Sequence, residues 1–264
     1  MTRKPTIIRT LAILFSVMIM SLSGISKASS VKGIVSLDLC TDWMLLKYAD
    51  RNQVRAFSSL LYKYHADWVP LGLPLHDGSL ENILQLEPEL LITGEYNALL
   101  LRKRLVQLGK NVSVLSLPTN LDNIQNYHRE FLTLIDVDPG KNPVDWNKTY
   151  PDRNQSLLLL GPNGIGTGKK TLENDLLHKA GWQNYLGSTG YISLDMERIV
   201  DQPPDAIYWS APESQSLSNL FIDHPAITQI TNNRQQPEKE NWRWQCPGPW
   251  SLDLIEELSQ WQKY

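Results

Sequence analysis

The chain has 264 residues, of which 42% are hydrophobic and 20% are charged, and its formal net charge is −3. The slight acidic excess and the lack of a basic cluster argue against a nucleic-acid-binding protein. Two cysteines are too few for a disulfide scaffold, so stability has to come from a packed core.

The first 28 residues have the organisation of a secretory signal peptide. A basic start precedes an apolar stretch at residues 11–20, and residues 26–28 (Ser-Lys-Ala) offer a cleavage site. The apolar stretch is short for a membrane span, so we expect cleavage after Ala28 rather than an uncleaved anchor. The remainder carries 21 Lys and Arg against 28 Asp and Glu, a formal charge of −7. We therefore expect a soluble, exported protein and, in the absence of other signals, a monomer.

The first half of the mature chain alternates between strands and helices. Hydrophobic runs, helical spacing and a stop at Gly109 define these elements. The expected elements are strand 32–37, turn 38–41, helix 42–49, helix 99–108 and strand 112–117. Residues 55–78 are interpreted as a long aromatic-rich loop.

The second half repeats this alternation after a connecting segment. Apolar residues keep helical spacing over 121–135, which predicts a connecting helix, and the polar segment 138–155 reads as a loop or broken helix. The elements expected beyond it are strand 156–160, helix 172–180 and a C-terminal helix whose apolar face includes residues 254, 255, 258 and 261.

A sequence signature occurs twice, 116 residues apart. Residues 79–92 and 195–208 both place a capping residue two positions before a glutamate, which is Glu81 or Glu197. An apolar pair, a proline, an acid and an apolar run follow in both copies. This pattern predicts a short capped helix, stopped by proline, that leads into a buried strand. The repeat indicates two similar α/β lobes with mainly parallel sheets, joined by the connecting helix.

The expected organisation is a signal peptide (1–28), an N-terminal lobe (29–118), a connecting helix and linker (119–155) and a C-terminal lobe (156–264). Ligands of parallel α/β sheets bind beyond the carboxyl ends of the strands, so we expect a ligand cleft between the lobes. Cys40 and Cys246 lie in different lobes. An oxidising compartment permits a disulfide between them, but the sequence leaves open whether they bond or stay separate thiols.

Several segments resemble one known family of exported proteins. Residues 35–42 resemble the opening of substrate-binding proteins of the vitamin B12 and iron-siderophore ABC importer family, and Leu-Glu-x-Ile-Leu-x-x-x-Pro-Glu resembles its helix-to-strand signature. Residues 161–164, 176–182 and 244–249 resemble the second lobe of an uncharacterised branch. The resemblance implies a periplasmic protein that delivers a corrinoid or ferric siderophore to a permease in the inner membrane. It also implies that Glu81 and Glu197 dock onto that permease.

Aromatic side chains are the candidates for holding such a ligand. Flat hydrophobic chelates are bound by aromatic walls with a few polar contacts. Nine aromatic residues lie in loops or near strand ends, although some of them could fill the core instead: Trp43, Tyr62, Tyr64, Trp68, Tyr96, Tyr191, Trp209, Trp242 and Trp244. Strand-end positions favour Trp43, Tyr96 and Trp209 most. A histidine of the long loop, His65 or His76, could ligate the metal of a chelate.

The sequence offers no support for catalysis. Residues 161–171 are glycine-rich and follow a strand, but Asn163 and Lys170 break the phosphate-loop pattern. There is no nucleophile–base set, no paired catalytic carboxylates and no metal-binding spacing, so we expect no catalytic residue, cofactor or resident metal. Two alternatives stay open. One is a ligand-free sensor or interaction module, because Pro139 and Pro143 interrupt the connector, and the other is an exported enzyme that uses the glycine-rich turn.

Overall fold

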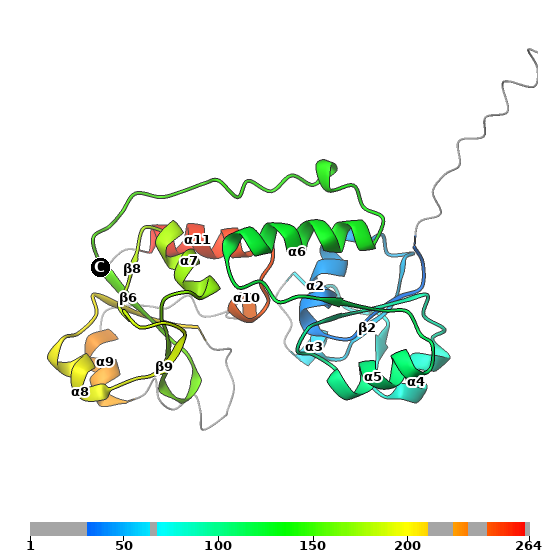
Figure 1. The fold of residues 1–264 in the computed structure, drawn as a ribbon, viewed down its shortest axis with the longest axis horizontal. Coiled ribbons are helices and arrows are strands. Elements are labelled where there is room, and N and C mark those ends of the chain that lie inside the picture. The colour runs from blue at the N-terminus through cyan, green and yellow to red at the C-terminus, as the bar shows by residue number, and fades with distance from the viewer. Residues whose placement is uncertain (1–30, 64–67, 211–223, 232–241, 262–264) are drawn as a thin grey trace, which may run out of the picture. The chain divides into compact units, whose positions relative to one another are not determined.

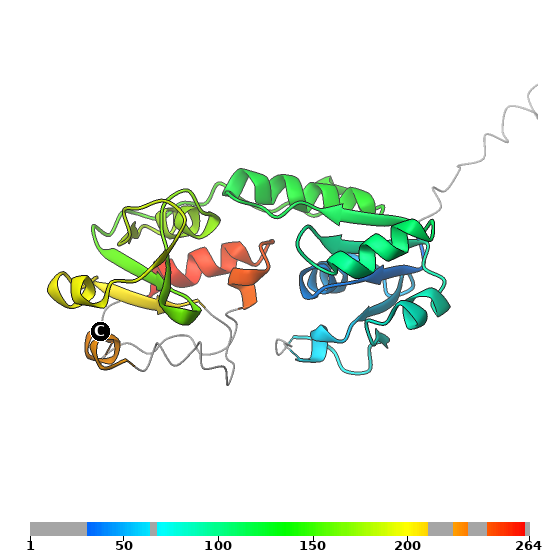
Figure 2. The same ribbon diagram turned by 60° about the horizontal axis from the view of Figure 1, so that its bottom comes forward.

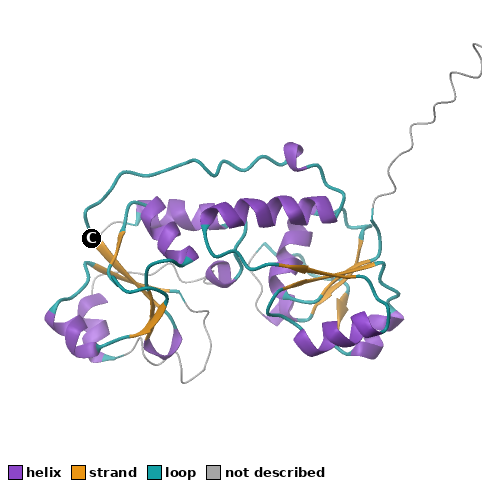
Figure 3. Cartoon of the chain, in the orientation of Figure 1, coloured by secondary structure: helices purple, strands orange, loops and turns teal. Residues whose placement is uncertain are grey.

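The structure, a computed structural model, describes residues 31–63, 68–210, 224–231 and 242–261 (Figures 1 and 3). Residues 31–264 form one compact unit. The predicted signal peptide lies outside the described residues. No helix in the described part of the chain combines the length and the apolar character needed to cross a membrane.

The N-terminal half contains a five-stranded parallel sheet in the order β3-β2-β1-β4-β5. Its central strands are buried because helices cover both faces. The strands are β1 (Ile34–Ser36), β2 (Val54–Ser58), β3 (Leu75–His76), β4 (Leu90–Gly94) and β5 (Val112–Leu115). The helices are α2 (Leu39–Tyr48) and α3 (Leu60–Lys63) against one face, and α4 (Leu80–Gln85) and α5 (Leu99–Gln107) against the other.

The C-terminal half contains a mixed sheet in the order β10-β6-β7-β9, and β8 also pairs with β6. Strands β10 and β8 run parallel to β6, whereas β7 is antiparallel to both β6 and β9. The strands are β6 (Ser156–Leu160), β7 (Ile165–Thr167), β8 (Gln183–Asn184), β9 (Tyr191–Ser193) and β10 (Ala206–Trp209). One face packs on α7 (Leu172–Lys179) and α11 (Ser251–Gln260), and the other on α8 (Met196–Asp201) and α9 (Pro225–Thr231). The shorter helices are η1 (Pro139–Lys141), η2 (Pro162–Gly164) and α10 (Trp242–Gln245).

The repeated sequence signature has the same structure in both halves. Helix α4 leads into β4, and α8 leads into β10. The Ser79 side chain accepts a hydrogen bond from the Asn82 backbone (3.2 Å), and the Asp195 carboxylate accepts one from the Glu197 backbone (3.0 Å). Each resulting strand lies parallel to the first strand of its half, β4 beside β1 and β10 beside β6. The prediction of two capped helices that feed buried strands is therefore confirmed.

Three expectations need correction. Residues 55–78 are not simply a loop, because they contain most of β2 together with α3 and β3. Helix α2 begins at Leu39 rather than at residue 42, since Asp38 is its N-cap and accepts a hydrogen bond from the Thr41 backbone (3.0 Å). The second sheet is less parallel than expected, because β7 forms inside the glycine-rich segment that reads as a turn.

Helix α6 (Leu121–Leu134) contributes to the cores of both halves. Its Ile124 packs in the cluster built on β6 and β10, whereas Tyr127, Phe131 and Leu132 pack in the cluster built on β1 and β4. Helices α6 and α11 lie level in Figure 1, and the turned view in Figure 2 separates them. The predicted connecting helix is thus present, and its apolar face is divided between two cores.

The linker that follows α6 is held against the C-terminal half. Trp146 is buried in that core, and Lys179 donates to its backbone carbonyl. Arg153 donates to the carbonyl of Trp261 (2.6 Å). Lys148 forms an ion pair with Glu256 on α11 (3.2 Å), and solvent screens this half-exposed pair, so it contributes little to stability.

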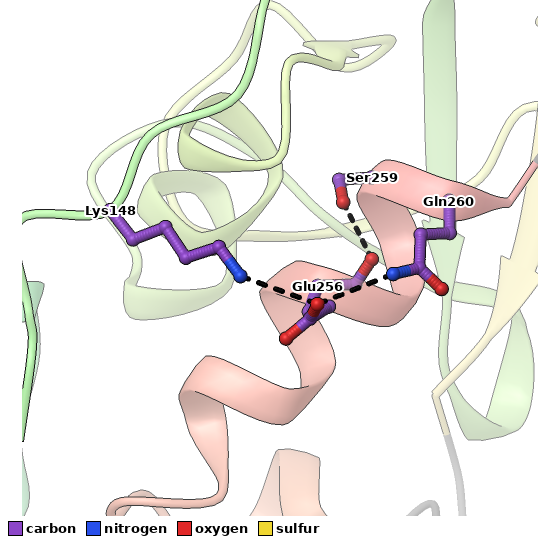
Figure 4. Close-up of polar contacts among 4 residues, drawn as sticks. All are labelled: Lys148, Glu256, Ser259 and Gln260. Carbon is purple, nitrogen blue, oxygen red and sulfur yellow. Dashed lines mark hydrogen bonds and ion pairs between the residues drawn. The ribbon is translucent and has the colours of Figure 1, made fainter.

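Figure 4 shows how α11 presents this glutamate to the linker. The Glu256 carboxylate also accepts from the Gln260 amide (3.3 Å), and its carbonyl accepts from the Ser259 hydroxyl (2.6 Å). Helix α6 ends at Leu134, before Pro139, the first proline of the connector, and the segment behind it is packed against the C-terminal half.

The C-terminal segment makes a further connection between the halves. Cys40 on α2 is joined to Cys246 by a disulfide, which the sequence alone left open. Trp250 belongs to the N-terminal core, where its ring meets Trp43 edge to face at 5.4 Å, while Leu254 and Leu258 on α11 belong to the C-terminal core. Helix α6, the disulfide and Trp250 together tie the two sheets into one unit.

Candidate functional site

One pocket is lined by residues of both halves, within the unit formed by residues 31–264. We call it the shared pocket. Its volume is about 360 Å³, toward the lower end of small-molecule sites. Its lining residues are Tyr96, Leu117, Pro118, Thr119, Lys170, Thr171, Leu172, Glu173, Tyr191, Trp244, Gln245 and Pro247.

The N-terminal wall of the shared pocket lies at the carboxyl ends of β4 and β5. Tyr96 follows β4, and 68% of its surface is exposed, so its ring is available to a ligand. The turn that carries it is fixed from two sides. Asp38 accepts a hydrogen bond from the Gly94 backbone (2.7 Å), and Arg102 on α5 donates to the Glu95 carbonyl (2.7 Å). The position after a strand end is the one that parallel sheets use for ligands.

The loop after β5 is tied to the same turn. The Glu95 carboxylate accepts a hydrogen bond from the Leu117 backbone (3.2 Å). This contact joins the two loops that supply the N-terminal wall. A change at either loop is therefore expected to move both.

The C-terminal wall carries a tyrosine–glutamate pair. The Tyr191 hydroxyl lies 3.1 Å and 3.4 Å from the two carboxylate oxygens of Glu173 and donates to them. Burial raises the pKa of Glu173, and burial together with the nearby carboxylate raises the pKa of Tyr191. Both shifts favour the protonated forms, so this wall presents a neutral phenol beside the Glu173 carboxyl group. Lys170 and the start of α7 complete this wall.

The third wall is formed by α10 and the residues after it. Trp244 is buried, and its ring packs against Tyr208 of β10 at 5.7 Å. Cys246, two residues later, is fixed to α2 by the disulfide. The wall is thereby anchored in both halves.

The chemistry of the shared pocket is aromatic with a few polar groups. Two phenols, an indole, a carboxylate and an ammonium group line it. Such a mixture suits a ligand with a flat apolar surface and several oxygen atoms. Among the described residues, no group of three or more His, Cys, Asp or Glu side chains could hold a bare metal ion.

The nine aromatic candidates separate into distinct environments. Tyr96, Tyr191 and Trp244 line the shared pocket, whereas Trp43 and Trp68 line a different cavity. Trp209 is buried in the C-terminal core.

The other three candidates are not placed in a pocket. The Tyr62 hydroxyl has a structural role, since it accepts from the Leu73 backbone (2.7 Å) and donates to the Pro70 carbonyl (3.2 Å). Tyr64 lies outside the described residues. Trp242 begins α10, but its side chain lies outside the described part of the structure.

The two charged residues of the shared pocket, Lys170 and Glu173, were not among the predicted binding residues. Lys170 lies at the end of the glycine-rich segment that was compared with a phosphate loop, and Glu173 follows it. Instead, the segment forms β7, antiparallel to β6, and the chain then enters α7. A signal did exist, because a polar stretch directly before a predicted helix marks a strand-to-helix turn at the edge of a sheet.

The two histidines of residues 55–78 were candidates for ligating the metal of a chelate. His76 is buried, its Nε2 donates to the Ser36 carbonyl (2.6 Å), and its Nδ1 accepts from the Gly78 backbone (3.0 Å). Both ring nitrogens are thus occupied, and burial lowers the pKa of this imidazole. His76 therefore does not serve as a metal ligand in this arrangement, and His65 lies outside the described residues.

The two glutamates of the repeated signature occupy matching positions. Glu81 lies in the first turn of α4 and Glu197 in the first turn of α8, and both are exposed. An acid in the first turn favours the helix dipole, which is sufficient to explain their presence. Their docking role stays a prediction.

Comparison with solved structures identifies the architecture. A possible iron-binding, periplasmic solute-binding protein from Staphylococcus epidermidis aligns with a TM-score of 0.64 at 20% identity, over 86% of this chain and 95% of that one. The periplasmic heme-binding protein HutB of Vibrio cholerae aligns with a TM-score of 0.63 at 18% identity, over 88% and 98%. This chain has the fold of the two-lobed periplasmic solute-binding proteins.

A similar fold is found in a protein that was solved with a different metal. A Helicobacter pylori protein, CeuE, solved with Ni(II) bound, aligns with a TM-score of 0.58 at 17% identity, over 88% of this chain and 83% of that one. No protein-family model matches the chain, and no curated protein matches it in sequence. The similarity to these solute-binding proteins is therefore one of fold.

Proposed function

We propose that this chain is the exported substrate-binding component of an ABC importer and that it carries a metal chelate in the shared pocket. The observation that supports this most is the pocket itself. Residues of both halves contribute aromatic side chains to it, from the end of β4, the start of β9 and α10, on the fold of solute-binding proteins. The solved relatives are described as binding iron, heme or nickel, which favours a metal-containing cargo.

The cargo class follows from the donor set. A chelate exposes apolar surface and oxygen atoms while its metal is already coordinated, so the absence of a three-residue metal site among the described residues agrees with a chelate better than with a bare ion. The ligand classes that fit are a ferric siderophore, a corrinoid and heme. With a pocket of about 360 Å³, we expect it to enclose one face or edge of such a molecule.

Intrinsic tryptophan fluorescence tests the proposal directly, because Trp244 lines the pocket. The purified protein is titrated with heme, cyanocobalamin and several ferric siderophores, with correction for inner-filter absorption. We expect saturable quenching by one class at micromolar or lower concentration. Flat titrations with all of them, on a folded protein, would overturn the chelate proposal and favour a ligand-free interaction module.

Two substitutions locate the binding in the shared pocket. Tyr96→Ala removes an exposed ring from one wall and is expected to weaken binding about tenfold or more, since a buried aromatic contact contributes more than 1 kcal/mol. Tyr96→Phe retains the ring and reports on the hydroxyl alone. Trp68→Ala, at an exposed position outside this pocket, is the matched control and should leave the affinity unchanged.

The importer contact is proposed to involve Glu81 and Glu197. A carboxylate on each half can pair with arginines of a permease and so report the arrangement of the halves. The double variant Glu81→Gln/Glu197→Gln should bind the chelate normally but lower stimulation of the importer's ATPase. Normal stimulation by the double variant would remove these residues from the proposal and leave chelate binding untouched.

A further inference from the structure

A second cavity lies beside α2 and α11. We call it the tryptophan cavity. Its volume is about 290 Å³, and it shares no lining residue with the shared pocket. Its lining residues are Trp43, Leu46, Lys47, Trp68, Arg243, Trp250 and Asp253. These come from the N-terminal half and from the C-terminal segment.

Three tryptophans give the tryptophan cavity a fixed aromatic wall. The Trp43 ring meets Trp68 at 5.7 Å with an interplanar angle of 64°, and it meets Trp250 at 5.4 Å with an angle of 87°. Edge-to-face pairs of this kind are favourable and directional. Trp43 and Trp250 are buried in the core, whereas 46% of Trp68 is exposed. The wall is thus rigid at its base and open at Trp68.

The buried base of this wall carries an unused hydrogen-bond donor. Trp43 is 2% exposed, and its Nε1 has no hydrogen-bond partner in the described part of the structure. A buried donor without an acceptor costs about 1–3 kcal/mol. A ligand that brings an acceptor oxygen to this N–H recovers that free energy, which an apolar ligand does not.

The charged residues of the cavity also favour an acceptor. Lys47 and Arg243 are cations and Asp253 is the one acid of the lining. The Arg243 guanidinium pairs with Glu257 on α11 (2.5 Å), so its charge is partly compensated. Lys47 lies one helical turn from Trp43 on α2, on the same side of that helix. Lys47 and Trp43 therefore line the same cavity from neighbouring turns of one helix.

We propose that the tryptophan cavity is a second binding site, for a small flat aromatic molecule that carries a carboxylate. The rings of the ligand pack on Trp68 and Trp250, its carboxylate accepts from Trp43 Nε1, and Lys47 neutralises it. Its size suits a molecule of one or two rings rather than a macrocycle. Aromatic faces also attract organic cations, but a cation offers no acceptor to Trp43 and is repelled by Lys47.

The residues that form the cavity suggest a consequence of occupancy. Trp43, Lys47 and Trp68 belong to the N-terminal half, whereas Trp250 is the N-cap of α11 and Asp253 lies in its first turn. A bound molecule contacts both, beside the disulfide between Cys40 and Cys246. Such a ligand stabilises the arrangement of the two halves in which the cavity exists.

The test uses two probes of matched shape and opposite charge, 1-naphthoate and 1-naphthylmethylammonium. Their affinities for the purified protein are measured by isothermal titration calorimetry, and the indole N–H resonances are followed in ¹⁵N–¹H spectra. The Trp43 resonance is assigned by its loss in Trp43→Phe. We expect naphthoate to bind at least about tenfold more tightly than the ammonium probe and to shift the Trp43 resonance.

Variants at exposed positions separate this site from the shared pocket. Lys47→Gln and Trp68→Ala should each weaken naphthoate binding about tenfold, whereas Lys170→Gln, in the shared pocket, should not change it. Binding lost in Lys170→Gln and retained in Lys47→Gln would overturn the proposal. So would preference for the ammonium probe, an unmoved Trp43 resonance, or failure of naphthoate to bind.

Discussion

The two sheets begin alike and then diverge, and the point of divergence shows which part of the sequence governs which part of the fold. In both halves a capped helix leads into a strand that lies parallel to the first strand, β4 beside β1 and β10 beside β6. On the other side of the first strand the halves differ. The N-terminal half adds β2 and β3 in parallel, whereas β8 ends after two residues and an antiparallel β7 takes the next place along β6.

Glycine allows this second arrangement. A Cβ at Gly166 would lie 2.5 Å from a methyl group of Leu186, and a Cβ at Gly168 would lie 2.2 Å from the Ser188 carbonyl oxygen. The chain is therefore closely packed along and directly after β7, and the backbone contact at Gly168 leaves no room for a side chain there. The glycines that resemble a phosphate loop in sequence serve close packing of β7 against its neighbours.

The largest effect is expected from matched truncations in the two cores. Leu91 on β4 and Ile207 on β10 are both completely buried, so each change to Ala should cost about 2–5 kcal/mol of unfolding free energy. Because α6 contributes to both cores, we expect one cooperative urea transition in each variant, shifted to lower denaturant. Circular dichroism and tryptophan fluorescence should give the same midpoint.

Leu100→Ala is the control, since 86% of Leu100 is exposed and its loss should change stability by less than about 0.5 kcal/mol. Two resolved transitions, of which each truncation shifts only one, would show that the halves unfold independently despite α6.

Removal of the disulfide tests whether the two halves unfold together. Changing Cys40 and Cys246 to Ser removes the covalent connection between α2 and the segment after α10. We expect a loss of about 2–4 kcal/mol and a broader or divided urea transition, because the cross-link restricts the unfolded chain and the halves then depend on α6 and Trp250 alone. Wild-type protein in excess reductant should behave like the variant, and an unchanged midpoint in both cases would contradict this prediction.

Patterns of local sequence predicted much of the fold. Capping residues and helical spacing located α4, α5, α6, α7 and α8 to within a few residues, because those signals are local. The short strands β3, β8 and β9 were not predicted, since two or three residues carry no periodicity and their pairing is decided by neighbours distant in sequence.

The site was less predictable than the fold. Tyr96, which follows a strand, lines the shared pocket and its ligand contact stays a prediction, whereas Trp209, at an equivalent place, is buried in the core. The difference arises because α9 packs against β10 and covers its face, and the sequence gives no indication of that contact. The disulfide could not be predicted for the same reason, because it requires that the segment after α10 lie beside α2, 206 residues away in the sequence.

A buried carboxyl group on α2 is expected to make the stability of the N-terminal half depend on pH. Asp42 is completely buried and accepts hydrogen bonds from the Ser58 backbone (2.9 Å) and hydroxyl (2.5 Å). Burial raises its pKa to about 7 from a usual value of 3.8. Between pH 3.8 and pH 7 the folded state therefore keeps a proton on Asp42 that the unfolded state has lost. The stability that this protonation contributes is complete below pH 3.8 and is lost as the pH rises through 7.

Asp42→Asn should remove that dependence. The amide keeps an acceptor for the Ser58 backbone and a donor for its hydroxyl without a charge. The free energy of unfolding is measured by urea titration for both proteins at pH 4 and at pH 8. We expect the difference, variant minus wild type, to be more favourable at pH 8 than at pH 4 by on the order of 3 kcal/mol. Asp50→Asn, at an exposed position, is the control. A constant difference between Asp42→Asn and wild type at all pH values would contradict the assignment.

The smallest effect concerns the glycines that distinguish the C-terminal sheet. Gly168→Ala places a methyl group against the Ser188 carbonyl, so either β7 or the turn at Ser188 must move, at a cost of about 1–3 kcal/mol. Gly187→Ala is the matched control in the same region, because a Cβ there meets nothing within 4 Å and the change should be close to neutral.

Since Gly168 lies two residues before Lys170, Gly168→Ala should also weaken chelate binding in the shared pocket, which calorimetry measures. Equal melting temperatures for the two variants would mean that β7 adjusts freely, and that close packing does not explain the glycines.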